Sequence, residues 1–187
     1  RYAEPKNFLT VVAKDYTLKA DGAQVLFQQG ARLQLADKKA SAYTVKVPVR
    51  TKEGKLQEEK VVLAANASLH EGYLPYTTNN IIRSAFKFYD SVYGWGGLQQ
   101  SVDCSSFISN AYRTVGIFLP RNADEQETSA GIHKKMGNMN SAQRANVIKG
   151  LTPGSTLHMD GHVMLYLGSS NEIPYAIHSL GSHYTGG

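Results

Sequence analysis

The chain contains a single cysteine among its 187 residues. An internal disulfide is therefore excluded, and the cysteine content is neutral about the redox compartment. No apolar run is long enough to span a membrane, and none has the form of a secretory h-region. The formal charge is +5 and the pI is about 9.2, but no Lys/Arg cluster or aromatic RNA-binding motif accompanies this charge. The composition therefore favours an anionic partner other than nucleic acid.

The cysteine, Cys104, stands where a helix is expected to begin. Apolar residues recur at helical spacing from Cys104 to Val115, Asp103 is a good N-cap residue, and Gly116 is a natural helix stop. Unpaired backbone N–H groups in a first helical turn favour a thiolate and could hold a developing oxyanion. A single cysteine is also often a small buried core residue. The helix alone leaves both interpretations open.

Two histidines far downstream favour the reactive interpretation. One cysteine with separated histidines is typical of thiol hydrolases, because the fold brings these residues together. His162 lies in an apolar run over 161–168 and His178 in a second run over 175–179, which predict a β-hairpin. A hairpin centred on Ser170 places the two histidines directly opposite each other. The first would then deprotonate the cysteine, and the second would fix the tautomer of the first.

A metal site is the competing interpretation of the histidines. His158 and His162 are four residues apart, and His178 and His183 are five apart. Four-residue spacing suits a helical face, but an Asp-Gly pair breaks any helix between the first two. Since no acidic ligand is well placed either, neither a metal nor another cofactor is predicted.

Several ordered motifs resemble those of the NlpC-type cell-wall cysteine peptidases. They are Tyr-Gly-Trp-Gly-Gly at 93–97, Asp-Cys-Ser-Ser-Phe at 103–107, Leu-Pro-Arg-Asn at 119–122, Leu-Thr-Pro-Gly at 151–154, Gly-His-Val at 161–163 and Ile-His at 177–178. Motifs in this order at compatible spacings are specific, and the resemblance covers about residues 76 to 183. It implies a papain-like α+β domain in which the cysteine opens a helix packed on an antiparallel sheet.

The resemblance also implies roles for individual residues. Cys104 corresponds to the nucleophile, His162 to the general base and His178 to the residue that orients the base. Tyr93 corresponds to an active-site tyrosine near the thiol. The remaining residues that we expect to bind substrate are Trp95, Asp103, Ser105, Arg121 and Asn122.

Three of these positions leave alternatives open. Trp95 either stacks on a sugar or peptide or fills the core, and Arg121 forms a buried ion pair or lies at the surface. Family members specific for a free N-terminal L-alanine carry an aspartate where this chain has Asn122, which offers no charge. Asp124, two residues later, is a candidate substitute. The sequence therefore leaves the cut site undetermined.

The N-terminal third consists of short β-rich runs separated by turn signals, which is typical of a small barrel. The runs are 8–18, 24–27, 31–36, 42–49 and 60–63. This part resembles a bacterial SH3-like module, which would bind cell wall, form a wall of the substrate groove or serve as a passive scaffold. We therefore expect an SH3-like β-barrel over residues 1–75 and an NlpC-type domain over residues 76–187.

Three further elements are expected in the second part. Thr77 or Thr78 caps a helix that runs to about Asp90. A loop is expected over 127–140, and a helix over 141–149. The apolar residues expected to pack inward from the first helix are Ile81, Ile82, Ala85, Phe86 and Tyr89.

The resemblance implies a peptidoglycan hydrolase of the bacterial envelope, which we expect to be either periplasmic or secreted. The expected reaction is thiol endopeptidase cleavage of the bond from γ-linked D-glutamate to the diamino acid of a stem peptide, through an acyl-enzyme. The alternatives are an N-acetylmuramoyl-L-alanine amidase of the same fold and a non-catalytic cell-wall-binding protein. The expected partners are stem peptides or muropeptides. Because the chain begins at Arg1 and ends at Gly187, soon after the third triad residue, we also expect a longer protein.

Overall fold

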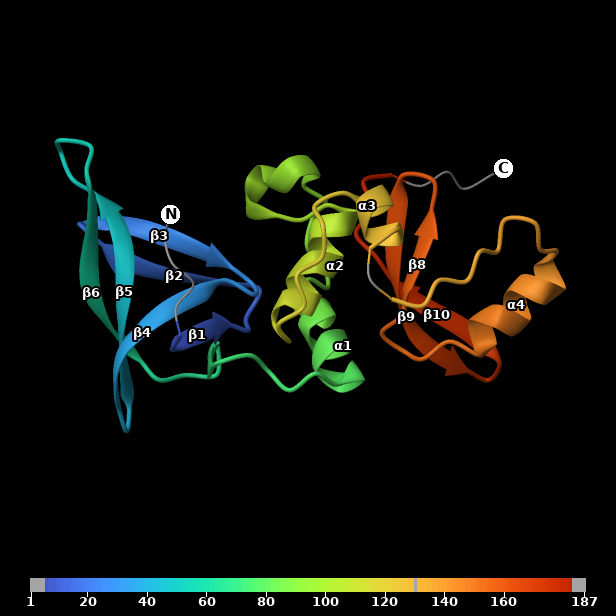
Figure 1. Ribbon diagram of the computed structural model, residues 1–187, viewed down its shortest axis with the longest axis horizontal. Helices are drawn as coiled ribbons and strands as arrows, with labels where there is room; N and C mark the ends of the chain where they lie inside the picture. The colour runs from blue at the N-terminus through green and yellow to red at the C-terminus, as the bar shows by residue number, and fades with distance from the viewer. Residues whose placement is uncertain (1–5, 130, 183–187) are drawn as a thin grey trace. The chain divides into compact units, whose positions relative to one another are not determined.

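The computed structural model describes residues 6–129 and 131–182, which belong to two compact units (Figure 1). The N-terminal unit comprises Arg1–Tyr76 and Arg113–Gly116, and the C-terminal unit comprises Thr77–Tyr112 and Ile117–Gly187. His183, one of the histidines weighed for a metal site, lies outside the described residues.

The described part of the N-terminal unit is built from antiparallel strands. They are β1 (Phe8–Val11), β2 (Asp15–Ala20), β3 (Ala23–Gln28), β4 (Arg32–Lys39), β5 (Ala42–Arg50), β6 (Leu56–Ala64) and β7 (Leu69–Glu71). A five-stranded sheet has the order β6-β5-β4-β1-β7, and β2 and β3 form a separate hairpin. Val45 and Val47 of β5 are buried at the two-residue period of a strand, and they pack with Leu9, Val11 and Leu33. Strands thus occupy the predicted runs, but the run 8–18 divides into β1 and β2, and β7 was not predicted. The SH3-like barrel stays a prediction.

The C-terminal unit combines helices with a three-stranded antiparallel sheet of order β10-β9-β8, as the expected mixed class requires. Its elements are α1 (Thr78–Phe86), the 3-10 helix η1 (Trp95–Gln100), α2 (Cys104–Arg113, whose last residue belongs to the N-terminal unit), α3 (Ala123–Glu127), α4 (Ser141–Lys149), β8 (Thr156–Met159), β9 (His162–Ser170) and β10 (Ile173–Ile177). The core includes Phe107, Ile108 and Ala111 on one face of α2, and Val163 and Leu165 on one face of β9.

Helix α1 differs from its prediction at the C-terminal end. It stops at Phe86 rather than Asp90, so the residues beyond it no longer follow helical periodicity. Phe86 and Tyr89 are exposed and stack on each other, so the prediction that they pack inward is wrong. Phe88 is the buried aromatic residue instead, and its ring meets that of Phe107 edge-on.

The remaining helices show what local signals can and cannot predict. Helix α4 has the predicted bounds, because Asn140 caps its start and Gly150 follows its end. Helix α3 was not predicted, and it precedes the expected loop. No helix among residues 6–129 and 131–182 is both long enough and apolar enough to cross a membrane.

Candidate active site

Cys104 is the first residue of α2, as predicted, and its side chain is buried. The backbone N–H of Ser106 donates to Asp103 Oδ1 at 2.9 Å, and the hydroxyl of Ser106 accepts from the backbone N–H of Asp103 at 2.9 Å. This reciprocal cap fixes the point at which the helix begins. The thiol therefore lies in the first turn, where helical N–H groups have no intrahelical partner.

The carboxylate of Asp103 is a buried junction between three segments. It accepts from the backbone N–H groups of Ser106 and Gly96, and the Arg121 guanidinium binds both of its oxygens, at 3.2 and 2.6 Å. Burial raises the pKa of Asp103, but the hydrogen bonds from Arg121, Ser106 and Gly96 outweigh burial and lower it to about 2. The carboxylate is thus ionised at any pH at which the protein is expected to work.

Arg121 combines the two alternatives that the sequence left open, because it forms an ion pair with the buried Asp103 and lies at the surface itself. Its guanidinium also donates to the hydroxyl of Ser105 at 3.0 Å, while its side chain remains 52% exposed. Asp103 and Ser105 are both 4% exposed, and the hydroxyl of Ser105 donates to Asp103 Oδ1 at 3.3 Å. Their predicted role in substrate binding remains a prediction. In this structure they tie the loop that carries Arg121 to the start of α2.

The β9–β10 hairpin has a different register from the predicted one. Ser170 pairs with Ile173, so the turn lies at 171–172 and is not centred on Ser170. Both turn residues have positive φ, as in a type I′ turn, although neither is glycine. Further along, Ile177 pairs with Leu165, because a bulge leaves Leu167 unpaired. The prediction that the two histidines oppose each other directly is therefore wrong.

The two imidazoles nevertheless meet, as predicted. Nε2 of His162 lies 2.8 Å from Nδ1 of His178, and the rings are arranged edge to face. If His162 donates this hydrogen bond, its Nδ1 carries a lone pair and can accept a proton. Burial lowers the pKa of His162, and repulsion from His178 lowers it further, so the neutral base persists below pH 6.5.

Contacts around Val102 bring the end of the hairpin to the start of α2. Ser179, which directly follows the second histidine, donates to the Val102 carbonyl at 2.9 Å. Val102 also pairs with Tyr93 in an isolated β-bridge, and a Cβ added to Gly181 would lie 3.1 Å from the Tyr93 ring. Burial raises the pKa of Tyr93, and the nearby thiol of Cys104 and carboxylate of Asp103 raise it further. The predicted active-site tyrosine thus lies close enough to Cys104 for the two groups to interact electrostatically.

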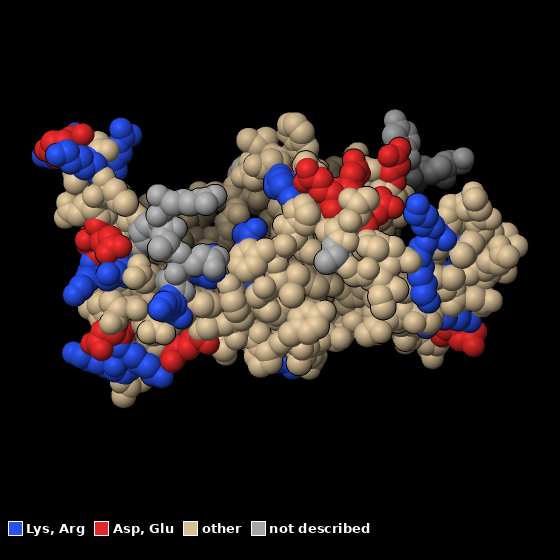
Figure 2. All heavy atoms as spheres, in the orientation of Figure 1, with Lys and Arg blue, Asp and Glu red and all other residues tan. Residues whose placement is uncertain are grey.

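Trp95 and Asn122 lie at the surface. Trp95 is 73% exposed, so the alternative in which it fills the core is wrong. Asn122 is the N-cap of α3, and its backbone N–H donates to the Glu125 carboxylate at 3.3 Å. Acidic side chains gather over α3 in Figure 2, and Asp124 is exposed in its first turn.

Gln126 is a buried residue of this site that the sequence analysis missed. Its amide nitrogen donates to the Ser105 carbonyl, the Ser109 hydroxyl and the Pro120 carbonyl, at 3.0, 2.9 and 2.9 Å. It therefore fastens α3 and the preceding loop to the first turns of α2. The signal was present in the sequence, since Asn122 followed by Glu125 three residues later is a capping box that marks a helix start.

The histidines do not assemble a metal site within the described part of the chain. Across residues 6–129 and 131–182, no three His, Cys, Asp or Glu side chains gather in a way that could hold a metal ion. His158 lies on β8 and hydrogen-bonds Thr156 in the same strand.

Comparison with known proteins places this geometry in context. Residues 90–183, half of the chain, match the NlpC/P60 family. The chain is similar in structure to a novel NlpC/P60 endopeptidase from Photobacterium damselae subsp. piscicida, with a TM-score of 0.68 and 23% identity. It is also similar to an NlpC/P60 family protein from Bacillus cereus ATCC 10987, with a TM-score of 0.60 and 18% identity.

The two structural matches extend beyond the family segment. They cover 91% and 92% of this chain but only 40% and 58% of the proteins that it resembles. No curated protein sequence matches the chain. At these identities the structural likeness concerns the fold.

Proposed function

Because the chain belongs to the NlpC/P60 family, we propose that it is a peptidoglycan hydrolase in which Cys104 is the nucleophile of a thiol endopeptidase. The observation that carries this proposal is the hydrogen bond between His162 and His178, in a hairpin whose exit is bonded to the residues leading into Cys104. A thiol at a helix start and an oriented imidazole are the two parts that nucleophilic catalysis by cysteine requires.

The reaction follows from the roles of these groups. Nδ1 of His162 takes the thiol proton, and the Cys104 thiolate forms a bond to the carbonyl carbon of the scissile amide. The backbone N–H groups of the first turn of α2 stabilise the negative charge on the carbonyl oxygen. As the C–N bond breaks, His162 returns the proton to the leaving amine. Water then attacks the thioester with His162 as the base, which releases the acid and the free thiol.

We propose that the scissile bond joins γ-linked D-glutamate to the diamino acid of the stem peptide. The resemblance of the ordered sequence motifs to those of the family supports this choice. The residue that follows Arg121 would meet the amino end of the stem, and here it is the uncharged Asn122. We therefore expect a weaker requirement for a free amine than in members with an aspartate at this position.

We propose that the N-terminal unit is an SH3-like module that binds cell wall. Its short antiparallel strands and small hairpin support this assignment, as does the chain's formal charge of +5, which suits an anionic polymer. A substrate of this kind lies outside the cytoplasm, so we also propose a periplasmic or secreted location.

Mass spectrometry of defined muropeptides tests the proposed reaction. Wild-type protein is expected to release a product ending in D-glutamate, whereas Cys104→Ala should lose at least about 10³-fold of this activity. Because the chain has one cysteine, a thiol-directed alkylating reagent modifies only Cys104 and provides an independent check. Release of an intact stem from the sugar would instead identify an amidase. Binding to sacculi without any product would identify a wall-binding protein.

A further inference from the structure

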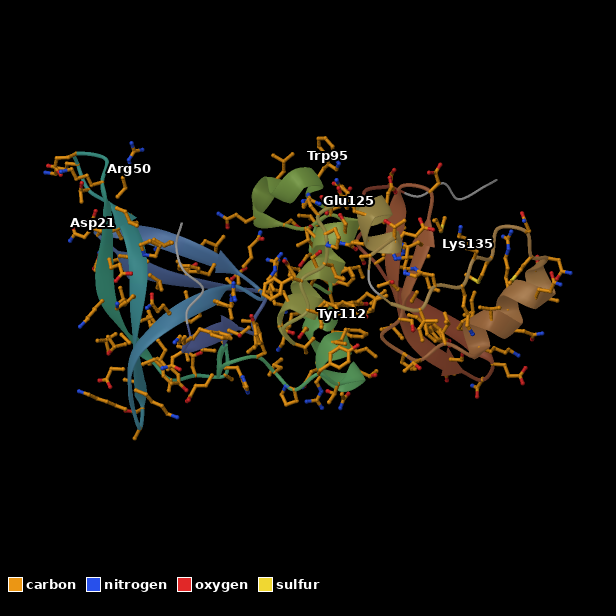
Figure 3. All side chains as sticks on the ribbon, in the orientation of Figure 1. Asp21, Arg50, Trp95, Tyr112, Glu125 and Lys135 are labelled. Carbon is orange, nitrogen blue, oxygen red and sulfur yellow. The ribbon has the colours of Figure 1, made fainter. Side chains whose placement is uncertain are left out.

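Two large apolar side chains of the 3-10 helix η1 are exposed to solvent. Trp95 is 73% exposed and Leu98 is 65% exposed. Trp95 and Leu98 are three residues apart in η1, with Gly96 and Gly97 between them at φ of +65° and +88°. Figure 3 shows Trp95 extending away from the ribbon. We call these two side chains the η1 platform.

The platform rests on a closely bonded turn. Backbone N–H groups of Gly94 and Ser101 donate to the carbonyls of Val102 and Leu98, at 3.0 and 3.1 Å. The Ser101 hydroxyl donates to the Val92 carbonyl, which closes the base of the turn. A Cβ on Gly94 would collide with the Leu98 carbonyl oxygen, so only glycine permits this packing. The backbone that carries the exposed tryptophan is therefore held by hydrogen bonds at both ends of the turn.

The same turn is attached to the residues that lead into the thiol. The backbone N–H of Gly96, next to Trp95, donates to Oδ2 of Asp103 at 3.2 Å. On the other side of the turn, Tyr93 pairs with Val102. A molecule that lies on the platform thus sits beside the segment that carries Cys104.

We infer that the η1 platform is a glycan subsite, which binds a pyranose ring of the sugar strand to which the cleaved stem is attached. This inference rests on the proposed function. The C–H face of a pyranose packs on the electron-rich face of an indole, and an apolar neighbour such as Leu98 adds to that contact. Neither platform side chain is charged, so the platform suits a sugar ring better than the carboxylates and amines of the stem.

Trp95 emission provides a direct test, because Trp95 is the only tryptophan in the chain. The full chain carrying Cys104→Ala is titrated with the disaccharide of N-acetylglucosamine and N-acetylmuramic acid, without peptide. We expect a saturable change in Trp95 emission, and a Leu98→Ala variant should bind about fivefold more weakly. Tyr89→Ala is the matched control, since Tyr89 is an equally exposed aromatic residue outside η1, and it should leave the titration unchanged.

Three results would overturn the inference. The first is Trp95 emission that the disaccharide does not alter, and the second is emission that only free stem peptide alters. The third is emission that changes with protein concentration alone, which would indicate that a second copy of the chain binds the platform. The titration needs no turnover, so it is separable from the proposed hydrolysis. Disaccharide binding by a protein that cuts no muropeptide would support the subsite while refuting the enzyme.

A kinetic comparison on active protein completes the test. The ratio of kcat/KM for disaccharide-linked stem to that for free stem should fall about fivefold in Trp95→Ala. The same ratio should stay at the wild-type value in Tyr89→Ala. An unchanged ratio in Trp95→Ala would also overturn the inference.

Discussion

The imidazoles of His162 and His178 lie 2.8 Å apart although the two residues do not oppose each other in the strand ladder. Ile177 pairs with Leu165 beyond the bulge, and continuing this register by one residue brings His178 beside Met164. Met164 is two residues from His162, so its side chain points to the same side of β9. Without the unpaired Leu167 the register would slip by one residue, and His178 would point to the opposite side of the sheet. The bulge thus decides that the two rings can meet.

His178 is expected to orient His162 by accepting its Nε2 proton. His178→Asn retains an acceptor oxygen near the position of Nδ1, whereas His178→Ala retains none. We therefore expect the asparagine variant to keep more activity than the alanine variant, and both to keep more than His162→Ala. Values of kcat/KM for a defined muropeptide test this order, and an alanine variant as active as the asparagine variant would contradict it.

Replacing His178 should also shift the acid limb of the pH dependence of kcat/KM. Burial lowers the pKa of His162 first, and repulsion from His178 lowers it further. Removing His178 removes that repulsion, so the pKa of His162 should rise towards 6.5 and the acid limb of kcat/KM should move to higher pH. His133→Asn alters an exposed histidine that hydrogen-bonds Ser129, and it should leave the limb in place. An acid limb of kcat/KM that moves to lower pH in His178→Asn would refute this account.

Asp103 should stabilise the fold in a pH-dependent way. Its pKa of about 2 in the folded protein lies below its ordinary value of 3.8, so its contribution to stability is present above pH 4 and is lost as the pH falls towards 2. The difference corresponds to about 2 kcal/mol at neutral pH. Asp103→Asn, which still caps the helix, should therefore unfold at a lower urea concentration at pH 7, and the deficit should more than halve by pH 2.5.

The exposed Asp124 supplies the control for this measurement. Asp124→Asn should change the urea midpoint by much less at either pH, since its carboxylate has no ion pair in the structure's described residues. A deficit in Asp103→Asn that is independent of pH would show that packing, and not the charge of Asp103, accounts for the loss.

The buried side chain of Gln126 should contribute to the stability of the fold. Gln126→Glu keeps the shape of the side chain but removes both amide N–H donors, which three acceptors share, and places a carboxylate against two carbonyls. The free energy of unfolding should fall by roughly 2 kcal/mol, because buried acceptors lose their donor. Gln143→Glu makes the same change at an exposed capping-box position in α4 and should be nearly neutral. Equal effects of the two variants on urea denaturation would contradict the proposed role.

Asn122 offers a test of substrate choice. Asn122→Asp adds a negative charge at the N-cap of α3, where aspartate is as favourable as asparagine, so stability should be retained. The ratio of turnover on stems with a free amine to turnover on N-blocked stems should rise several-fold. A ratio that stays at the wild-type value would show that this position does not meet the amino end of the stem.

The sequence by itself determined the elements whose signals are local. Asp103 before an apolar helical stripe specified where α2 begins, and Asn140 and Gly150 specified both ends of α4. These predictions succeeded because caps and helical periodicity act within one or two turns of the chain. The alternation of short strands and turns in the N-terminal unit was predictable for the same reason.

Only the tertiary structure decided the features that depend on residues distant in sequence. The helical stripe of α1 did not reveal that Phe88 would be buried against Phe107 while Phe86 faces water. The charges of Asp103 and Arg121 did not reveal that they pair across 18 residues. The register of β9 and β10 depended on a turn without glycine and on an unpaired Leu167, which no periodicity marks. A one-residue slip reverses the side to which a strand residue points, so the meeting of His162 and His178 was settled by long-range packing.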